Sequence, residues 1–87
     1  MLKMSQNAGE RLTELLQDSG PGCAVRIDTR DRRLTVCRDR KRSGDLTFAH
    51  QGKVVLVVDE RISRVLTGHM LDTRATETGT RLRLKPQ

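Results

Sequence analysis

A run of aliphatic residues in the middle of the chain constrains the fold most. Residues 53–59 read KVVLVVD, and in an extended strand their apolar side chains point to both sides. A strand that is apolar on both faces must be covered on both faces, so we predict that it lies in the centre of a sheet. Asp59 is the predicted N-cap of a short helix over 60–68. Its predicted inward residues are Ile62, Val65 and Leu66.

The N-terminal part of the chain has the apolar spacing of an amphipathic helix over residues 5–18. Ser5 or Asn7 is the predicted N-cap, and the segment SGPG ends the helix because proline and glycine do not continue it. The apolar stripe consists of Met4, Ala8, Leu12, Leu15 and Leu16.

Short strands are predicted for most of the remaining chain, at 23–28, 33–38, 46–50, 69–76 and 78–87. No long helices separate them, which argues against a doubly wound parallel sheet. Because 87 residues form one domain by default, we predict a single domain over 1–87. Its fold class is mainly β (α+β): a small, mainly antiparallel, sandwich-like sheet with an N-terminal helix packed on it and one short second helix.

The strands 23–28 and 33–38 are predicted to form a hairpin with a loop at 29–32. Matching the apolar faces places Val25 opposite Val36 and Ile27 opposite Leu34. Cys23 then lies opposite Arg38, Cys37 lies opposite Ala24, and the two thiols face opposite sides. A disulfide or a shared metal ion is therefore not expected within one chain. Cys23 is predicted to be a small core residue, and Cys37 to be the exposed thiol and the weak candidate for a metal ligand or an oxidisable group.

Positive charge is concentrated in this hairpin. The net charge of the chain is +6, and residues 26–42 contain eight basic and three acidic side chains. Such a stretch is typical either of a solvated hairpin or of a surface that binds nucleic acid or another polyanion. The candidate polyanion-binding residues are Arg30, Arg32, Arg33, Arg38, Arg40, Lys41 and Arg42.

Several classes of function lack their sequence signature. There is no glycine-rich phosphate loop, no Cys-x-x-Cys pair and no His-x-x-x-His pair. His50 and His69 are predicted to be surface residues, and no catalytic residue is predicted, so we do not expect an enzyme. The start of the chain lacks the apolar stretch of a signal peptide, and its longest aliphatic run, VVLVV, is too short to cross a membrane. We expect a cytoplasmic protein with reduced thiols and no membrane partner.

The order of these elements resembles the HesB/IscA-like family, the A-type carriers of iron–sulfur cluster assembly. LKMSQNAGERLTELL is similar to the family's opening strand, serine and helix, and AVRID to its next strand. GKVVLVVDERISRVLTGHMLD carries the strongest likeness, and TGTRLRLKP is similar to the closing strand. The matching positions of that segment are Gly52, Val54 to Val58, Asp59, Leu66, Gly68, Leu71 and Asp72. The resemblance implies a HesB-type domain.

The chain differs from the family at the ligand positions. The family's carriers bind iron or a cluster through one cysteine in a Cys-Ser-Gly loop and two in a Cys-Gly-Cys tail. Here the loop reads TRDRR, the sequence stops at Lys85, Pro86 and Gln87, and Cys37 lies in the following strand. No family ligand can be carried over, so we expect no cofactor.

These observations favour a degenerate HesB/IscA-like protein that has lost cluster binding. It would act as a non-catalytic accessory or interaction protein in the context of iron–sulfur cluster assembly, with an unidentified protein partner. One alternative is a basic module that binds nucleic acid or another polyanion through 26–42. Another is a homo-oligomer that binds iron or a cluster between subunits through Cys37.

Overall fold

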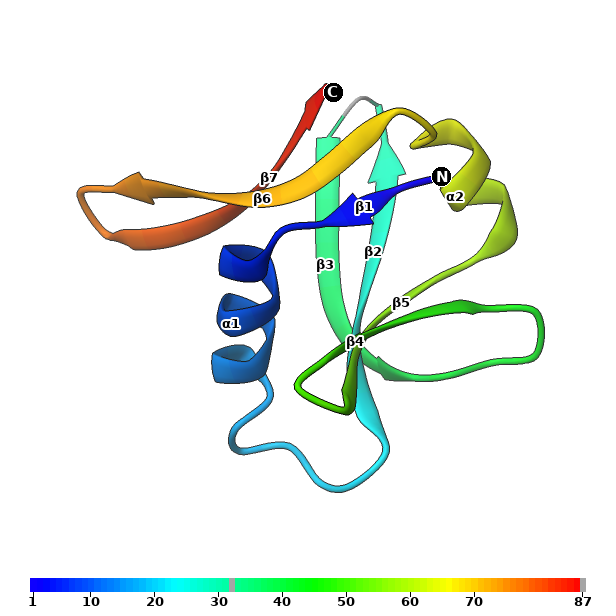
Figure 1. Cartoon of the computed structure of the whole chain (residues 1–87), viewed down its shortest axis with the longest axis horizontal. Helices are drawn as coiled ribbons and strands as arrows, with labels where there is room; N and C mark the ends of the chain where they lie inside the picture. Colours follow the sequence, from blue (N-terminus) through cyan, green and yellow to red (C-terminus); the bar gives the residue numbers. More distant parts are fainter. Residues whose placement is uncertain (32, 87) are drawn as a thin grey trace.

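The computed structural model describes residues 1–31 and 33–86 and contains two β-sheets and two helices (Figure 1). The four-stranded sheet has the order β3 (Arg33–Arg40), β2 (Cys23–Arg30), β5 (Lys53–Val58) and β4 (Leu46–His50). The three-stranded sheet has the order β1 (Lys3–Met4), β6 (His69–Thr76) and β7 (Gly79–Pro86). The helices are α1 (Gln6–Leu15) and α2 (Glu60–Val65). This confirms the predicted mainly β, α+β class.

Strand β5 lies inside its sheet, as its sequence predicts. It pairs in parallel with β2 and antiparallel with β4, and its residues 55–58 are all buried. Strand β1 also pairs in parallel, with β6, while β2–β3, β4–β5 and β6–β7 are antiparallel. Both sheets are therefore mixed. The two parallel pairs connect strands far apart in the sequence, which strand-by-strand reasoning did not pair.

Both helices begin at their predicted caps. Ser5 Oγ accepts a hydrogen bond from the backbone N–H of Ala8, and Asp59 Oδ1 accepts one from that of Ile62. Helix α1 ends at Leu15, three residues before the predicted end, and ordered turns follow it. On α2, Ile62 and the following Leu66 are buried as predicted, but Val65 is exposed because the short helix has only one covered side. Neither helix is long and apolar enough to span a lipid bilayer.

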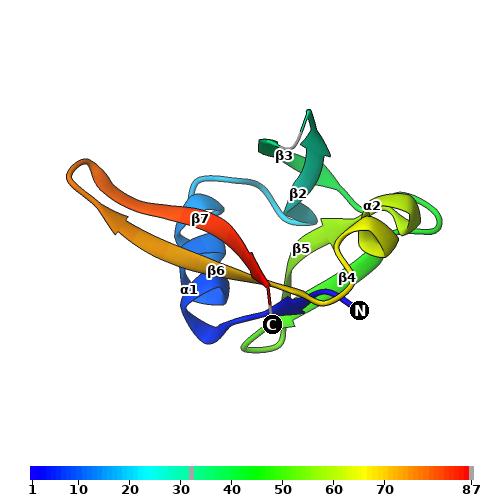
Figure 2. The ribbon, with the colours of Figure 1, turned by 90° about the horizontal axis from the view of Figure 1, so that it is seen from above.

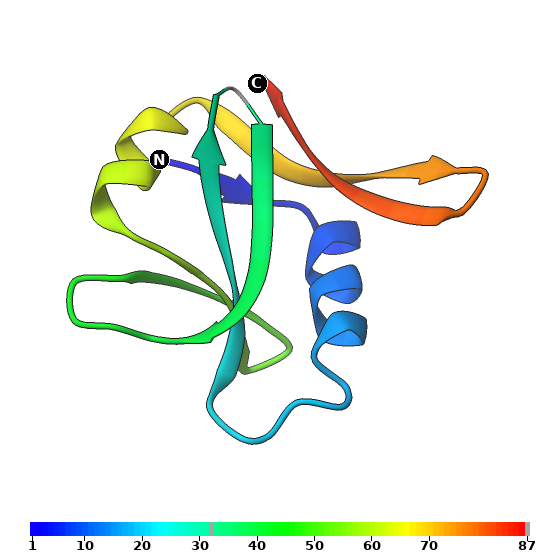
Figure 3. The same cartoon turned by 180° about the vertical axis from the view of Figure 1, so that it is seen from behind.

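The two sheets and both helices share one hydrophobic core. Figures 1 and 3 show the molecule from opposite sides. In both views the β6–β7 hairpin extends away from the four-stranded sheet, and α1 lies next to this hairpin. Helix α1 contacts β6 and β7 on one side and β4 and β5 on the other. It therefore bridges the two sheets. The buried core cluster consists of Leu2, Ala8, Leu12, Leu16, Val25, Ile27, Val55, Leu56, Val58, Ile62, Leu66 and Leu71.

A polar joint fixes the start of α1 to the three-stranded sheet. The Ser5 N–H donates to the Leu71 carbonyl at 2.9 Å, and Ser5 Oγ donates to Asp72 Oδ1 at 2.7 Å. Lys85 Nζ lies 3.1 Å from the other oxygen of Asp72. The Ser5 hydroxyl, the Thr73 N–H and the Lys85 ammonium lower the pKa of Asp72 to about 2. One carboxylate therefore joins α1, β6 and β7.

Neither histidine lies freely on the surface, contrary to the prediction. His50 packs on Gly9 of α1 so closely that a Cβ at Gly9 would lie 2.5 Å from His50 Nδ1. The glycine thus allows the helix to approach the end of β4. His69 follows α2 and is half-buried, and within residues 1–31 and 33–86 its Nδ1 has no hydrogen-bond partner.

Candidate functional site

The β2–β3 hairpin carries both cysteines and most of the predicted basic residues, and its register differs from the prediction by two residues. Val25 lies opposite Arg38, and Ile27 lies opposite Val36. Pairing continues to Arg30 and Arg33, so two residues join the strands instead of four. Asp31 there has a φ of 53°, which suits a tight turn. A shift of two residues keeps each side chain on its predicted face, so matching of apolar faces could not detect it.

The two cysteines face opposite sides of the hairpin, as predicted. Cys23 is half-buried on the face of Val25 and lies opposite Arg40. Cys37 is exposed on the other face and lies opposite Arg26, not Ala24. Because the sheet separates the thiols, they cannot bind one metal ion or cluster together within a chain. Within the described residues, no group of three or more His, Cys, Asp or Glu residues is placed to hold a metal ion.

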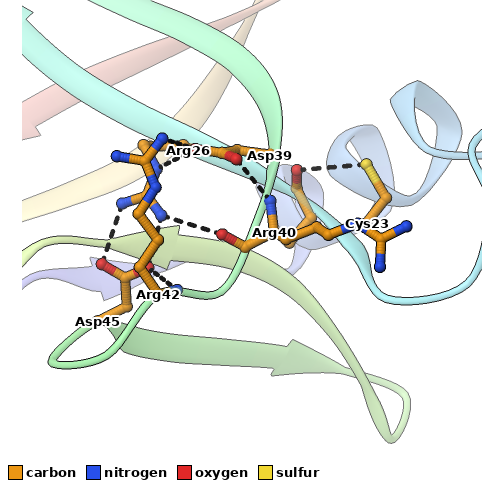
Figure 4. Close-up of polar contacts among 7 residues, drawn as sticks. Cys23, Arg26, Asp39, Arg40, Arg42 and Asp45 are labelled. Carbon is orange, nitrogen blue, oxygen red and sulfur yellow. Dashed lines mark hydrogen bonds and ion pairs between the residues drawn. The ribbon is translucent and has the colours of Figure 1, made fainter.

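An ion-pair network occupies the base of the hairpin (Figure 4). Arg26 Nε donates to Asp39 Oδ2 at 2.8 Å, and its Nη1 and Nη2 both donate to Asp45, with Nη1 3.0 Å from Oδ1. Arg42 completes the network through Asp39, at 2.9 Å. The side chain of Asp45 is 3% exposed, and the guanidinium of Arg26 lowers its pKa to about 2. The hydrogen bond to Asp45 is also the largest of the causes that raise the pKa of Arg26.

This network was not predicted from the sequence, although three of its four residues lie in the basic stretch 26–42. Asp45 is the residue that pattern reasoning missed. It sits in the turn before β4, where the Arg42 N–H donates to Asp45 Oδ2 and the Asp45 N–H donates to the Arg42 carbonyl. The three-residue spacing of Arg42 and Asp45 could have predicted this turn. The contact of Arg26 with Asp45 could not be predicted, because only the fold brings them together. Two arginines and two aspartates thus neutralise one another.

The predicted polyanion-binding residues do not share one surface. Arg30 and Arg33 lie near the β2–β3 turn on the face of Cys37, whereas Arg38 and Arg40 lie on the opposite face. Arg42 belongs to the ion-pair network. Lys41 lies in the following turn, and Arg32 is outside the described residues. Within the described residues, five candidates have no ion-pair partner: Arg30, Arg33, Arg38, Arg40 and Lys41. A polyanion site stays a prediction.

The tip of the β2–β3 hairpin and the C-terminal end of β7 are not brought together. Figure 1 projects them onto the same region, but Figure 2, turned by a right angle, separates them clearly. The tip residues TRDRR, the region that the family likeness aligns with a ligand loop, contain no cysteine.

Comparison with solved structures identifies the fold. The chain superposes on the crystal structure of Escherichia coli SufA, involved in biosynthesis of iron–sulfur clusters, with a TM-score of 0.75 and 20% sequence identity. The match covers 98% of this chain and 84% of SufA. A second match is the crystal structure of IscA with a [2Fe-2S] cluster, with a TM-score of 0.68, 21% identity and coverage of 99% and 82%. This chain therefore has an IscA-like fold.

Searches by sequence give no corresponding assignment. No protein-family model matches the chain, and no curated protein matches it. The fold is thus established by shape at an identity too low to transfer function.

Proposed function

We propose that this protein is a non-catalytic accessory or interaction protein of iron–sulfur cluster assembly that does not hold a cluster within a single chain. The likeness of its fold to SufA and IscA, over almost the whole chain, supports the link to cluster assembly. The link is an analogy of fold, so it needs its own test.

One observation carries the loss of cluster binding. Iron–sulfur clusters are held mainly by cysteine thiolates. The chain has two cysteines, and they lie on opposite faces of the β2–β3 hairpin, with Cys23 half-buried and Cys37 exposed. One chain therefore offers one exposed thiol to an incoming cluster, and its other thiol is half-buried on the opposite face.

Anaerobic reconstitution with ferrous iron and sulfide tests this part. We expect no stoichiometric visible chromophore after desalting. A chromophore that is retained by the wild-type chain and lost in Cys37→Ser would instead support a site between two subunits. Cys23→Ser is the matched control, because it removes a thiol from the other face.

Interaction with the assembly machinery is a separate measurement. We expect the purified chain to co-elute with an A-type carrier or with a cluster scaffold protein at low salt, without taking up the cluster chromophore. If neither protein binds, the link to cluster assembly is lost, even if the chain also fails to bind a cluster.

Five basic side chains of residues 26–42 that have no ion-pair partner among the described residues favour a second candidate, a polyanion-binding module. Six phosphate contacts would weaken binding by roughly 10³ between 50 and 200 mM salt. Binding of duplex DNA, single-stranded DNA or RNA at low salt, reduced in an Arg38→Glu/Arg40→Glu variant, would support it. Failure of all three probes at 50 mM salt removes it.

A further inference from the structure

A groove runs between α1, β3 and β7. Two adjoining hollows form it, and both are lined by Leu15 and Val36. The apolar residues of the groove include Leu15, Leu34, Val36 and Leu82. Figure 2 shows the three elements around this side of the molecule. We call it the α1–β3–β7 groove.

The floor of the groove is partly open to water. Val36 is 49% exposed although it is a β-branched residue on the face of Val25 and Ile27. Leu15, Leu34 and Leu82 are half-buried against the core. Apolar side chains on an open surface between three elements are typical of a binding site.

The charged residues of the groove all have one sign. Of the described residues that line it, three are arginines, Arg11, Arg38 and Arg81, and none is acidic. Arg11 contacts Glu14 at 3.1 Å, but both side chains are exposed enough that this pair is weak. The groove therefore combines an apolar floor with a positive rim.

Both strands beside the groove are the outermost strands of their sheets. β3 pairs with β2 alone, and β7 pairs with β6 alone, within the described residues. A terminal strand has backbone N–H and C=O groups that an extended peptide can pair with. An extended segment that alternates apolar and acidic residues would place one side on the floor and direct its carboxylates to the arginines.

We propose that the α1–β3–β7 groove binds an extended, acidic segment of a partner protein in which apolar and acidic residues alternate. The proposal deepens the proposed function, since it rests on the chain acting as an interaction protein and names the chemistry of its partner. It does not depend on iron or on a cluster, so its test is independent of reconstitution.

The test is a fluorescence-anisotropy titration of the full chain. The probe is a fluorescein-labelled ten-residue peptide that alternates glutamate with valine or leucine. Two control peptides replace glutamate by lysine, or keep the composition but group all acids at one end. We expect saturable binding of the alternating peptide, weakened by raising the salt from 50 to 200 mM, and weak binding of both controls.

Matched variants locate the site. Val36→Asp and Arg38→Glu are expected to weaken binding by about tenfold or more, the scale of a central interface residue. Val54→Asp is the control for Val36, because Val54 is also partly exposed, at 41%, and does not line the groove. Arg61→Glu on α2 is the control for the charge change. Both controls are expected to bind within twofold of wild type, and circular dichroism checks that all four variants fold.

Three results would overturn the proposal. The first is equal binding by Val36→Asp and Val54→Asp. The second is evidence of general attraction to polyanions. Either of two observations would give it: equal binding of the alternating and the grouped peptide, or loss of binding in Arg38→Glu only. The third is that the protein does not bind the peptide but forms a dimer, and that Val36→Asp abolishes this dimer. That result would assign the groove to a second copy of the chain.

Discussion

At the scale of single residues, His50 leaves no room for a side chain at Gly9. A methyl group at Gly9 would meet three atoms of the imidazole side chain, including Cβ at 3.2 Å. Because the Cβ atom is near the backbone of β4, rotation of the ring alone does not relieve the overlap. Helix propensity would favour alanine by about 1 kcal/mol, so this position tests packing against propensity.

We expect Gly9→Ala to destabilise the protein by about 1–3 kcal/mol, the usual cost of overpacking. Gly20→Ala is the control, because a Cβ added at Gly20 would have no atom within 4 Å of it. Urea unfolding monitored by circular dichroism measures both. His50→Ala should restore part of the loss in the double variant; a loss that is merely additive would contradict the contact.

Arg26 should also matter for stability, because the side chain of its partner Asp45 is buried. Arg26→Ala leaves that carboxylate without its guanidinium, and we expect a loss of about 3–5 kcal/mol. Arg64→Ala breaks an ion pair with Glu60 whose side chains are 76% and 66% exposed, and should cost under about 1 kcal/mol. Equal effects in urea unfolding would show that Asp45 is solvated.

The same pair predicts a pH dependence. The pKa of Asp45 in the folded protein is about 2, below the ordinary 3.8, mainly through its hydrogen bond from Arg26. The unfolded chain thus binds more protons between these values, so this contribution is complete above about pH 5 and is lost as the pH falls through 2. The urea midpoint of Asp45→Asn should fall less steeply than that of wild type from pH 5 to 2. Glu77→Gln, which changes an exposed carboxylate, serves as the control.

At the scale of elements, Ser5 is both the N-cap of α1 and a hydrogen-bond donor to Asp72 of β6. Ser5→Ala removes the acceptor for the Ala8 N–H and the donor to Asp72. We expect a loss of about 1–2 kcal/mol in urea unfolding, at the upper end of the usual range for a cap. Ser5→Thr retains the hydroxyl and should recover most of it. Ser5→Asp retains the cap but places a carboxylate beside Asp72, so it should recover little.

The elements also show what could be predicted from the sequence. The central position of β5 and the caps at Ser5 and Asp59 follow from local patterns, because apolar runs and capping oxygens act over a few residues. The register of β2 and β3 did not follow, because a shift of two residues leaves the same side chains facing the core. The groove was not predicted either, since Leu15, Val36 and Leu82 come from three segments that only tertiary packing brings together.

At the scale of the whole molecule, one core serves both sheets. Leu71 of β6 packs in the same buried cluster as Val25 of β2 and Leu56 of β5. The two sheets should therefore unfold together, although no backbone hydrogen bonds between strands join them within the described residues.

Leu71→Ala tests this cooperativity. Truncating a fully buried leucine should cost about 2–5 kcal/mol. Hydrogen exchange followed by NMR should show that protection falls in β2 and β5 as much as in β6. Loss of protection confined to β6 and β7 would instead mean that the three-stranded sheet opens by itself.

The parallel pairing of β1 with β6 has a consequence for how the chain folds during synthesis. Every pairing in the four-stranded sheet lies within residues 23–58, so that sheet can assemble as soon as this segment has left the ribosome. Lys3, by contrast, pairs with Met70, and Ser5 can donate its hydrogen bond to Asp72 only after β6 has been made. The residues of β1 are made before the residues of β6 that they pair with, so they reach their place late. Until then Leu2 and Leu12 stay accessible to chaperones on the nascent chain.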